Sequence, residues 1–165
     1  MFRALTVKRA LVACTLGLVL PGCVTTPPLE PGEDELALSD CPPLPNCAST
    51  EAASSSMHAI PAFELAMPVD RAWPLITETV RELPGTEILR EDETHHYLYA
   101  KAHSDVFGFV DYFEVLAVTR LEPDSGAKRL AVRSAAMLGI SDMGVNEART
   151  ARFREMLRGR GVIKP

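Results

Sequence analysis

Positive charge is scarce in this 165-residue chain. It contains 17 Lys and Arg against 22 Asp and Glu, a formal net charge of −5. Three of the basic residues and none of the acidic ones lie in residues 1–22, so the remainder has 14 basic and 22 acidic residues, a net charge of −8. A nucleic-acid partner needs a clustered basic face, so we predict none, and this balance also argues against peripheral binding to anionic lipid heads.

A long apolar run is also lacking. The stretch Leu11–Leu20 is uncharged but far shorter than the ~20 residues of a membrane-spanning helix. It follows three basic residues, a pattern typical of a secretory signal. No Ala-x-Ala cleavage site ends it; instead Leu20-Pro21-Gly22-Cys23 resembles a bacterial lipobox. We therefore predict a lipoprotein signal peptide over residues 1–22. We also predict that Cys23 carries a lipid with palmitate-type acyl chains. An ordinary signal peptide, or an uncleaved membrane stub with an accidental cysteine, is the alternative.

The predicted lipid anchor determines the expected location. A lipoprotein cysteine carries two or three acyl chains, and each buried methylene contributes about 0.8 kcal/mol, so membrane attachment is expected to be permanent. Val24 rather than Asp follows Cys23, which favours the inner leaflet of the outer membrane, facing the periplasm. Residues 23–40 contain three prolines, a glycine and clustered acids, which predicts a tether reaching roughly 20–25 Å.

Cysteine is rare too, with four residues. Cys14 leaves with the signal and Cys23 takes the lipid, which leaves Cys41 and Cys47. Outside the cytoplasm an isolated pair favours a disulfide. Free thiols remain an alternative, as does metal or redox chemistry, although zinc needs four ligands. We predict no metal, because the adjacent His95 and His96 would point to opposite faces of a strand. We also predict no cofactor.

Residues 41–165 are enough for one domain with a single core. Consecutive strand candidates with short turns predict an antiparallel sheet. We expect an α+β fold, with a single antiparallel sheet of about four strands and two helices on one face, in the order β-α-β-β-β-α. The first helix follows Pro68, with Asp70 as its N-cap, and a turn occupies 122–126. The predicted elements are a strand at 58–67, a helix to about 83, strands at about 86–103, 109–121 and 127–138, and a helix from Ser141 or Asp142 to about 158.

Four short motifs occur in order along this domain. They are Cys41-Pro-Pro-Leu-Pro-Asn-Cys47, Gly108-Phe-Val-Asp111, Arg133-Ser-Ala135, and Gly139-Ile-Ser-Asp-Met-Gly-Val-Asn146 with Arg149. Over residues 41–158 the chain resembles the bacterial and plastid family called domain of unknown function 1499 (DUF1499). The resemblance implies a small α+β domain, often exported or membrane-attached, with no established activity. The chain departs from the family pattern at Tyr112, where a second acid is common, and at Ala136 and Met137, where Ser-Arg is common.

Polar residues of these motifs form our candidate site. On the predicted strands, Asp111 and Arg133 can meet across neighbouring strands. Such a pair either presents a guanidinium to an anionic ligand or is a structural ion pair. Ser141 and Asp142 are expected to cap the last helix, and Asn146 and Arg149 to project toward the sheet, for packing or for ligand binding. The candidate binding or structural cluster is Asp111, Arg133, Ser134, Ser141, Asp142, Asn146 and Arg149.

Signatures of catalysis are missing from the sequence. It contains no Gly-x-Ser-x-Gly nucleophile elbow and no phosphate-binding glycine loop. We therefore expect a membrane-anchored binding domain for an envelope protein or a small anionic ligand. The alternative is an envelope hydrolase that uses Asp111, Arg133, Asp142 and Asn146.

Overall fold

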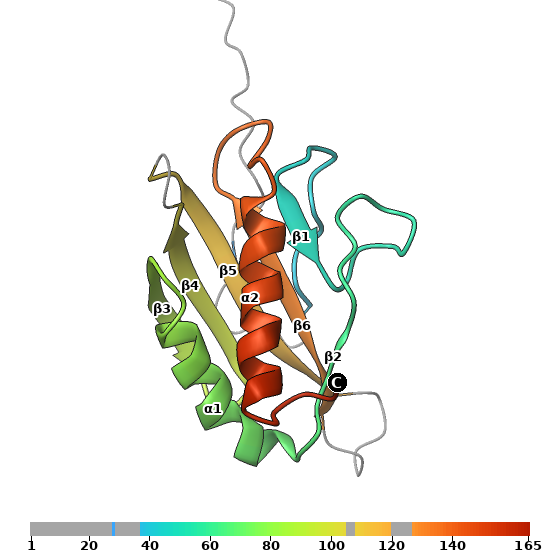
Figure 1. The fold of residues 1–165 in the computed structure, drawn as a ribbon, viewed down its shortest axis with the longest axis vertical. Helices are drawn as coiled ribbons and strands as arrows, with labels where there is room; N and C mark the ends of the chain where they lie inside the picture. Colours follow the sequence, from blue (N-terminus) through green and yellow to red (C-terminus); the bar gives the residue numbers. More distant parts are fainter. Residues whose placement is uncertain (1–27, 29–36, 105–107, 120–126) are drawn as a thin grey trace, which may run out of the picture.

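The computed structural model describes residues 28, 37–104, 108–119 and 127–165 (Figure 1). The predicted signal peptide, Cys23, most of the 23–40 tether and the predicted turn at 122–126 lie outside the described residues. Within them, no helix is both long and apolar enough to cross a bilayer. The elements are β1 (Cys47–Ser49), β2 (Phe63–Glu64), α1 (Val69–Arg81), β3 (Thr86–Asp92), β4 (Tyr97–His103), β5 (Val110–Thr119), β6 (Ala127–Ala136) and α2 (Val145–Gly159).

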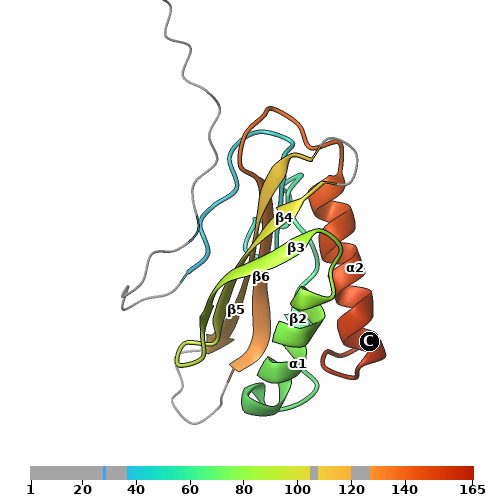
Figure 2. The same cartoon turned by 90° about the vertical axis from the view of Figure 1, so that its left-hand side faces the viewer.

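One antiparallel sheet forms the body of the domain. Its strand order is β1-β6-β5-β4-β3, and the short β2 also pairs with β6. Both helices lie on the same face of this sheet (Figures 1 and 2). The predicted α+β class, the antiparallel sheet and the two helices are therefore confirmed.

Within the part of the chain that the structure describes, the sheet has six strands rather than about four. The predicted strand at 86–103 is a hairpin of β3 and β4. Of the predicted first strand at 58–67, only the two residues of β2 are in a strand. The His95–His96 pair lies in the turn of this hairpin, where His96 has a φ of 48°. Our expectation that these histidines occupy a strand is wrong, because a positive φ ends the extended backbone there.

The apolar core lies between the sheet and the helices. Trp73, Ile76 and Val80 form one face of α1, and Phe153 and Leu157 do the same on α2. They pack on alternate residues of the strands, including Leu98, Phe113, Val115, Leu130 and Val132. Each such side chain contributes roughly 1.5–3 kcal/mol on burial. This packing holds α2 across β6, and α2 carries two residues of the candidate site.

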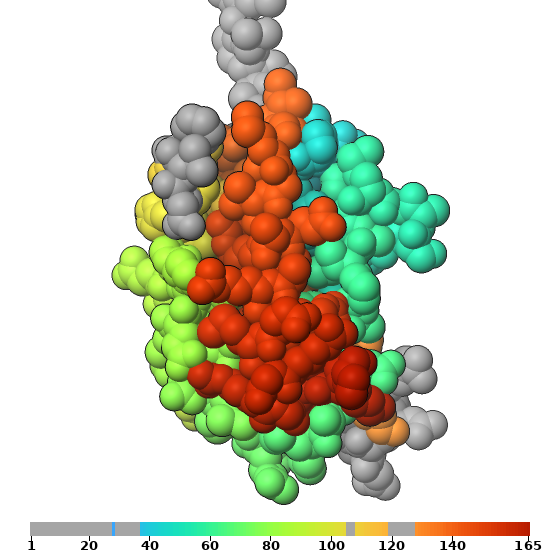
Figure 3. Space-filling view, in the orientation of Figure 1, coloured from blue at the N-terminus to red at the C-terminus, as the bar shows by residue number. Residues whose placement is uncertain are grey.

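The helix starts differ from our prediction by a few residues. Helix α1 begins at Val69 with Pro68 in the N-cap position, so Asp70 lies in the first turn and is not the cap. Helix α2 begins at Val145, after Gly144, whose φ is 82°. Residues 137–144, here called loop 137–144, therefore connect β6 to α2 and project at the top of the molecule in the space-filling view (Figure 3).

The opposite face of the sheet is crossed by residues 37–46 (Figure 2). Leu38 packs there on Tyr97, Leu116 and Ala131. This segment leads into β1 and is closed by a disulfide between Cys41 and Cys47. The sheet is thus covered on both faces, by the helices on one and by the incoming chain on the other.

A tight turn joins α1 to β3 and reaches the end of β4. Gly85 has a φ of 66°, and its carbonyl accepts a 2.9 Å hydrogen bond from the His103 backbone N–H. A Cβ at this position would lie 2.9 Å from the His103 carbonyl oxygen. Glycine is therefore required here for both reasons. The turn positions Leu83 and Pro84 opposite α2.

Candidate functional site

Four of the predicted residues meet beneath the first turns of α2. Asp111 and Ser134 point toward the helices, because they share a strand face with the core residues Phe113 and Val132. The side chains of Asn146 and Arg149 on α2 point toward this face and contact it. Asp111, Ser134 and Asn146 are almost completely buried, and the Arg149 side chain is 8% exposed.

The Arg149 guanidinium connects the cluster. Its Nη2 donates to Asp111 Oδ2 at 2.7 Å. Its Nη1 donates to Asn146 Oδ1 at 2.7 Å and to Ser134 Oγ at 3.0 Å. The Ser134 hydroxyl in turn donates to Asn146 Oδ1 at 2.6 Å. Hydrogen bonds to charged groups are about twice as strong as neutral ones, so this network fixes α2 on β5 and β6.

Asn46 extends the network to the disulfide segment. The Asn146 side-chain amide donates to the Asn46 carbonyl at 3.2 Å, and the Asn46 amide donates to the Gly139 carbonyl at 2.7 Å. Asn46 is completely buried. Its role was not predicted, although it stands next to Cys47 inside a recognised motif. Through these bonds the disulfide segment and loop 137–144 are tied to the start of α2.

Asp142 lies three residues before the start of α2, and its side chain bonds backbone amides at the start of this helix. Its carboxylate accepts hydrogen bonds from the backbone N–H groups of Gly144, at 3.0 Å, and Asn146, at 2.9 Å. A carboxylate at a helix N-terminus satisfies free amides and complements the helix dipole. Ser141 is exposed, and its hydroxyl accepts a 3.3 Å bond from the Met143 N–H.

Burial raises the pKa of the Asp111 carboxyl above its ordinary range, and the neighbouring Arg149 partly offsets this rise. The desolvation of the carboxylate is thus the larger effect, even with a guanidinium at 2.7 Å.

The expected Asp111–Arg133 pair does not form. In the register of β5 and β6, Asp111 lies opposite Ala136, and Arg133 lies opposite Glu114. Arg133 therefore points to the opposite sheet face, where its Nη1 donates to Glu114 Oε2 at 2.6 Å. Glu114 Oε1 accepts a 2.9 Å bond from the Tyr97 hydroxyl, and all three side chains are completely buried.

Glu114 and Tyr97 were not predicted as partners of Arg133. The available signal was the acid within the apolar run of 110–119, since an ionised residue in a buried strand needs a partner. Tyr112 lies on this same opposite face, with its ring 5.9 Å from that of Tyr99. The departure from the family pattern at Tyr112 therefore removes no group from the Asp111 cluster.

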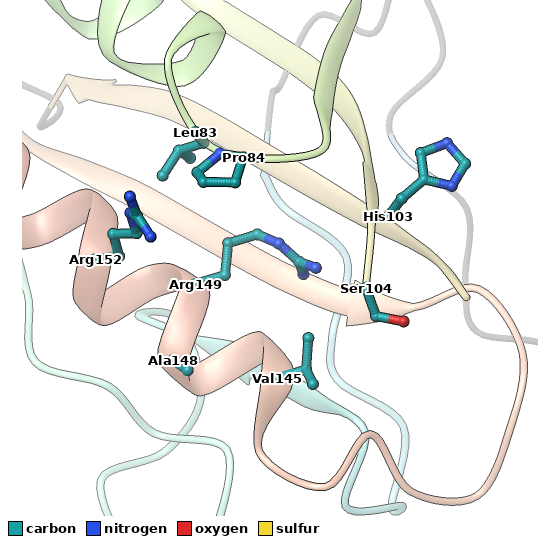
Figure 4. A pocket seen from close by; sticks show the side chains of 8 residues that line it. All are labelled: Leu83, Pro84, His103, Ser104, Val145, Ala148, Arg149 and Arg152. Carbon is teal, nitrogen blue, oxygen red and sulfur yellow. The ribbon is translucent and has the colours of Figure 1, made fainter. Parts of the chain in front are cut away.

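Two adjoining cavities lie beside the cluster. The larger, of about 450 Å³, has mostly apolar walls and is lined by Ser104, Phe109, Asp111, Ala136, Leu138, Gly139, Ser141, Asp142, Met143 and Val145. The smaller, of about 240 Å³, lies between α2 and the turn after α1 and is lined by Leu83, Pro84, His103, Ser104, Val145, Ala148, Arg149 and Arg152 (Figure 4). Ser104 and Val145 belong to both. Asp111 lines one cavity and Arg149 the other, so their ion pair forms part of the boundary.

The model of the protein family of unknown function DUF1499 matches residues 37–157. The chain belongs to the DUF1499 family. The matched residues include all strands of the sheet, the segment closed by the Cys41–Cys47 disulfide, the polar cluster and nearly all of α2. No curated protein and no solved structure matches the chain.

The described residues contain no group of three or more His, Cys, Asp and Glu side chains able to hold a metal ion. Ser134 is the hydroxyl within the cluster, and its partners are an amide and a guanidinium rather than a general base. The arrangement of this DUF1499 domain is that of a paired, buried polar network next to an apolar cavity.

Proposed function

We propose that this DUF1499 protein is a lipid-anchored envelope protein whose domain binds an apolar or amphipathic ligand in the larger cavity. The observation that carries this proposal is the cavity itself. Its volume of about 450 Å³ falls within the ~300–1,000 Å³ typical of small-molecule sites. Its walls are mainly apolar, with a few polar groups at one side, as in most such sites.

Exposed apolar side chains, three of them in its lining, lie at the larger cavity. Phe109, Leu138, Ile140 and Met143 are between 61% and 84% exposed, and all but Phe109 lie in loop 137–144. Among the described residues, the other exposed large apolar side chains are Met57 and Leu89. Such a local concentration of apolar surface is typical of a binding site, and methionine adapts its shape easily to a ligand.

The acids at the cavity wall are already paired within the protein. Asp111 is bound to Arg149, and the Asp142 carboxylate accepts two backbone N–H groups. Neither acid therefore requires a cation from the ligand. Apolar contacts supply most of the binding free energy in this proposal, and the hydrolase alternative has no supporting observation among the described residues.

The proposed location rests on the sequence. The lipobox-like Leu20-Pro21-Gly22-Cys23 supports a lipid on Cys23, and Val24 supports the periplasmic leaflet of the outer membrane. The membrane is thus the proposed partner of the N-terminus, and no nucleic acid is proposed as a partner. A lipid-anchored domain of this kind works within reach of the membrane, where apolar ligands are concentrated.

Photolabelling tests the proposed ligand site. The full chain, reconstituted in phosphatidylcholine nanodiscs, is exposed to a long-chain alcohol that carries a diazirine, and labelled peptides are mapped by mass spectrometry. We expect saturable labelling of peptides that contain Phe109 or loop 137–144. Leu138→Asp places a charge at the cavity and is expected to reduce the labelling at least about threefold, since burying an unpaired charge is unfavourable.

Leu89→Asp is the matched control. Leu89 has a similar exposed fraction, 51% against 61% for Leu138, and lies on the edge strand β3 away from the cavity. Its labelling is expected to equal that of the unchanged chain. Equal labelling of the Leu138→Asp and Leu89→Asp variants, both with unchanged circular dichroism, contradicts the proposed function.

A further inference from the structure

Building on the proposed function, we propose that the ligand is a single-chain fatty acid. Its acyl chain occupies the larger cavity, and its carboxylate binds Arg152 in the smaller one. The inference comes from the position of the two cavities beside each other and from Arg152, the arginine of α2 that has no hydrogen-bond or ion-pair partner among the described residues.

The two cavities adjoin along α2, because Ser104 and Val145 line both of them. In this proposal the ligand passes these two residues, with its acyl chain on one side and its carboxylate on the other. Arg152 lies seven residues after Val145, which is about 10 Å along a helix axis. In the close-up view the Arg152 side chain points toward Leu83 and Pro84, while the His103 ring points away from the cavity (Figure 4). The adjoining cavities therefore offer an apolar site and, next to it, a cationic site.

The arginines of α2 differ in their partners. Arg149 is bound to Asp111, Arg154 donates to the carbonyls of Pro61 and Ala62, and Arg158 pairs with Glu155. Arg152 makes no hydrogen bond or ion pair within the described part of the chain, and it lines the smaller cavity. A guanidinium is suited to a carboxylate because its planar N–H groups match the two oxygens. Arg152 is thus the available anion-binding group at this cavity.

The charges that face Arg152 allow an anion there. The Asp111 carboxylate belongs to the other cavity and is neutralised by Arg149, which lies one turn before Arg152 on the same helix. Among the described residues, none that lines the smaller cavity is acidic. Within this described lining, an anion at this position meets the guanidinium groups of Arg149 and Arg152.

The dimensions and the net charge favour a single molecule over a membrane surface. A volume of about 450 Å³ lies at the lower end of the range for ligand sites, which suits one acyl chain better than two. The chain after residue 22 has a net charge of −8, which disfavours docking on an anionic bilayer. A fatty-acid monomer carries a single negative charge, so it is repelled less than an anionic bilayer, and the local positive charge at Arg152 opposes that repulsion.

A matched pair of probes tests the inference. Myristate and myristyl alcohol, each with a terminal diazirine, are compared on the full chain in phosphatidylcholine nanodiscs. We expect the acid to half-saturate labelling of loop 137–144 at a concentration about threefold lower than the alcohol, the size of one partly exposed charge pair. Arg152→Gln is expected to abolish this difference. Arg158→Gln, on the same helix but outside both cavities, is expected to retain it.

The outcomes separate this inference from the proposed function. If both probes label loop 137–144 with equal half-saturation, or if Arg152→Gln keeps the preference for the acid, the fatty-acid inference is wrong and the apolar site stands. If neither probe labels the loop, both proposals fail. If phosphatidylglycerol in the nanodisc displaces the labelling and unlabelled myristate does not, the ligand is a membrane phospholipid, which also overturns the inference.

Discussion

At the scale of single residues, Arg149 is the group on which the buried contacts at the start of α2 depend. It bonds Asp111 on β5, Ser134 on β6 and Asn146 on its own helix. The neighbouring Asn146 continues these contacts to Asn46. Removal of one partner from a buried ion pair is unfavourable because the other charge remains buried without compensation. Arg149 is therefore a structural residue of the site's wall.

Replacement of Arg149 by Met tests this role. We expect a loss of about 3–5 kcal/mol in the free energy of unfolding at pH 7. Burial raises the pKa of Asp111, so the folded state holds the proton more tightly than the unfolded state. The contribution of Asp111 to stability is thus present below its unfolded pKa of about 3.9 and is lost as the pH rises through the higher folded pKa. Without Arg149 that pKa rises further, so the loss should be smaller at pH 4 than at pH 7.

Urea denaturation at the two pH values measures this difference. Arg152→Met, an exposed arginine one turn away, is the control and should change stability by less than about 0.5 kcal/mol. The double variant Asp111→Asn with Arg149→Met should lose less than the sum of the two single variants, because the charges are coupled. An equal loss at pH 4 and pH 7, with additive effects, would show that the ion pair does not determine the role of Arg149.

At the scale of elements, the segment closed by the Cys41–Cys47 disulfide is joined by hydrogen bonds to loop 137–144 and leads directly into β1. The Cys47 and Ser49 backbones pair with β6, and Asn46 bonds both Gly139 and Asn146. The Asp142 N–H also donates to the Pro45 carbonyl at 3.2 Å. The segment is therefore held by several hydrogen bonds in addition to the disulfide, and together they support one wall of the larger cavity.

The double variant Cys41→Ser with Cys47→Ser tests how much the disulfide adds. Closing a loop of about seven residues stabilises the folded state by about 2 kcal/mol in the chain-entropy view, and the prolines of the loop reduce this value. We expect a loss of about 1–2 kcal/mol in urea denaturation, with unchanged circular dichroism. The unchanged chain treated with reductant should match the variant. A variant that is unfolded in the absence of urea would show that the hydrogen bonds of Asn46 cannot hold the segment.

At the scale of the whole molecule, an acidic chain carries an apolar end. The chain after residue 22 has a net charge of −8, whereas Phe109, Leu138, Ile140 and Met143 expose large apolar surfaces near one another. This net charge disfavours contact with anionic lipid heads. We propose that the N-terminal lipid keeps this domain near the membrane without direct contact of its surface.

The lipid anchor is tested by Cys23→Ala in the full chain. We expect the variant to leave the membrane fraction, and its intact mass to lack the acyl chains of the unchanged protein, since no other residue is proposed to anchor it. Cys14→Ala, a change within the same N-terminal region, is the control and should remain in the membrane fraction. Unchanged membrane attachment of the Cys23→Ala variant contradicts the proposed anchor and location.

The sequence by itself determined the α+β class, the two helices and the family, because periodic apolar residues and short motifs are local properties of the chain. The sequence also placed Asp111 and Arg133 on neighbouring strands, but it could not decide which side chains would meet, and the expected pair does not form. Which side chains meet depends on strand register and on the docking of α2, which set Asp111 opposite Ala136 and brought Arg149 to it. Only the tertiary structure decided these partners and the two adjoining cavities, since they arise from packing between residues distant along the chain.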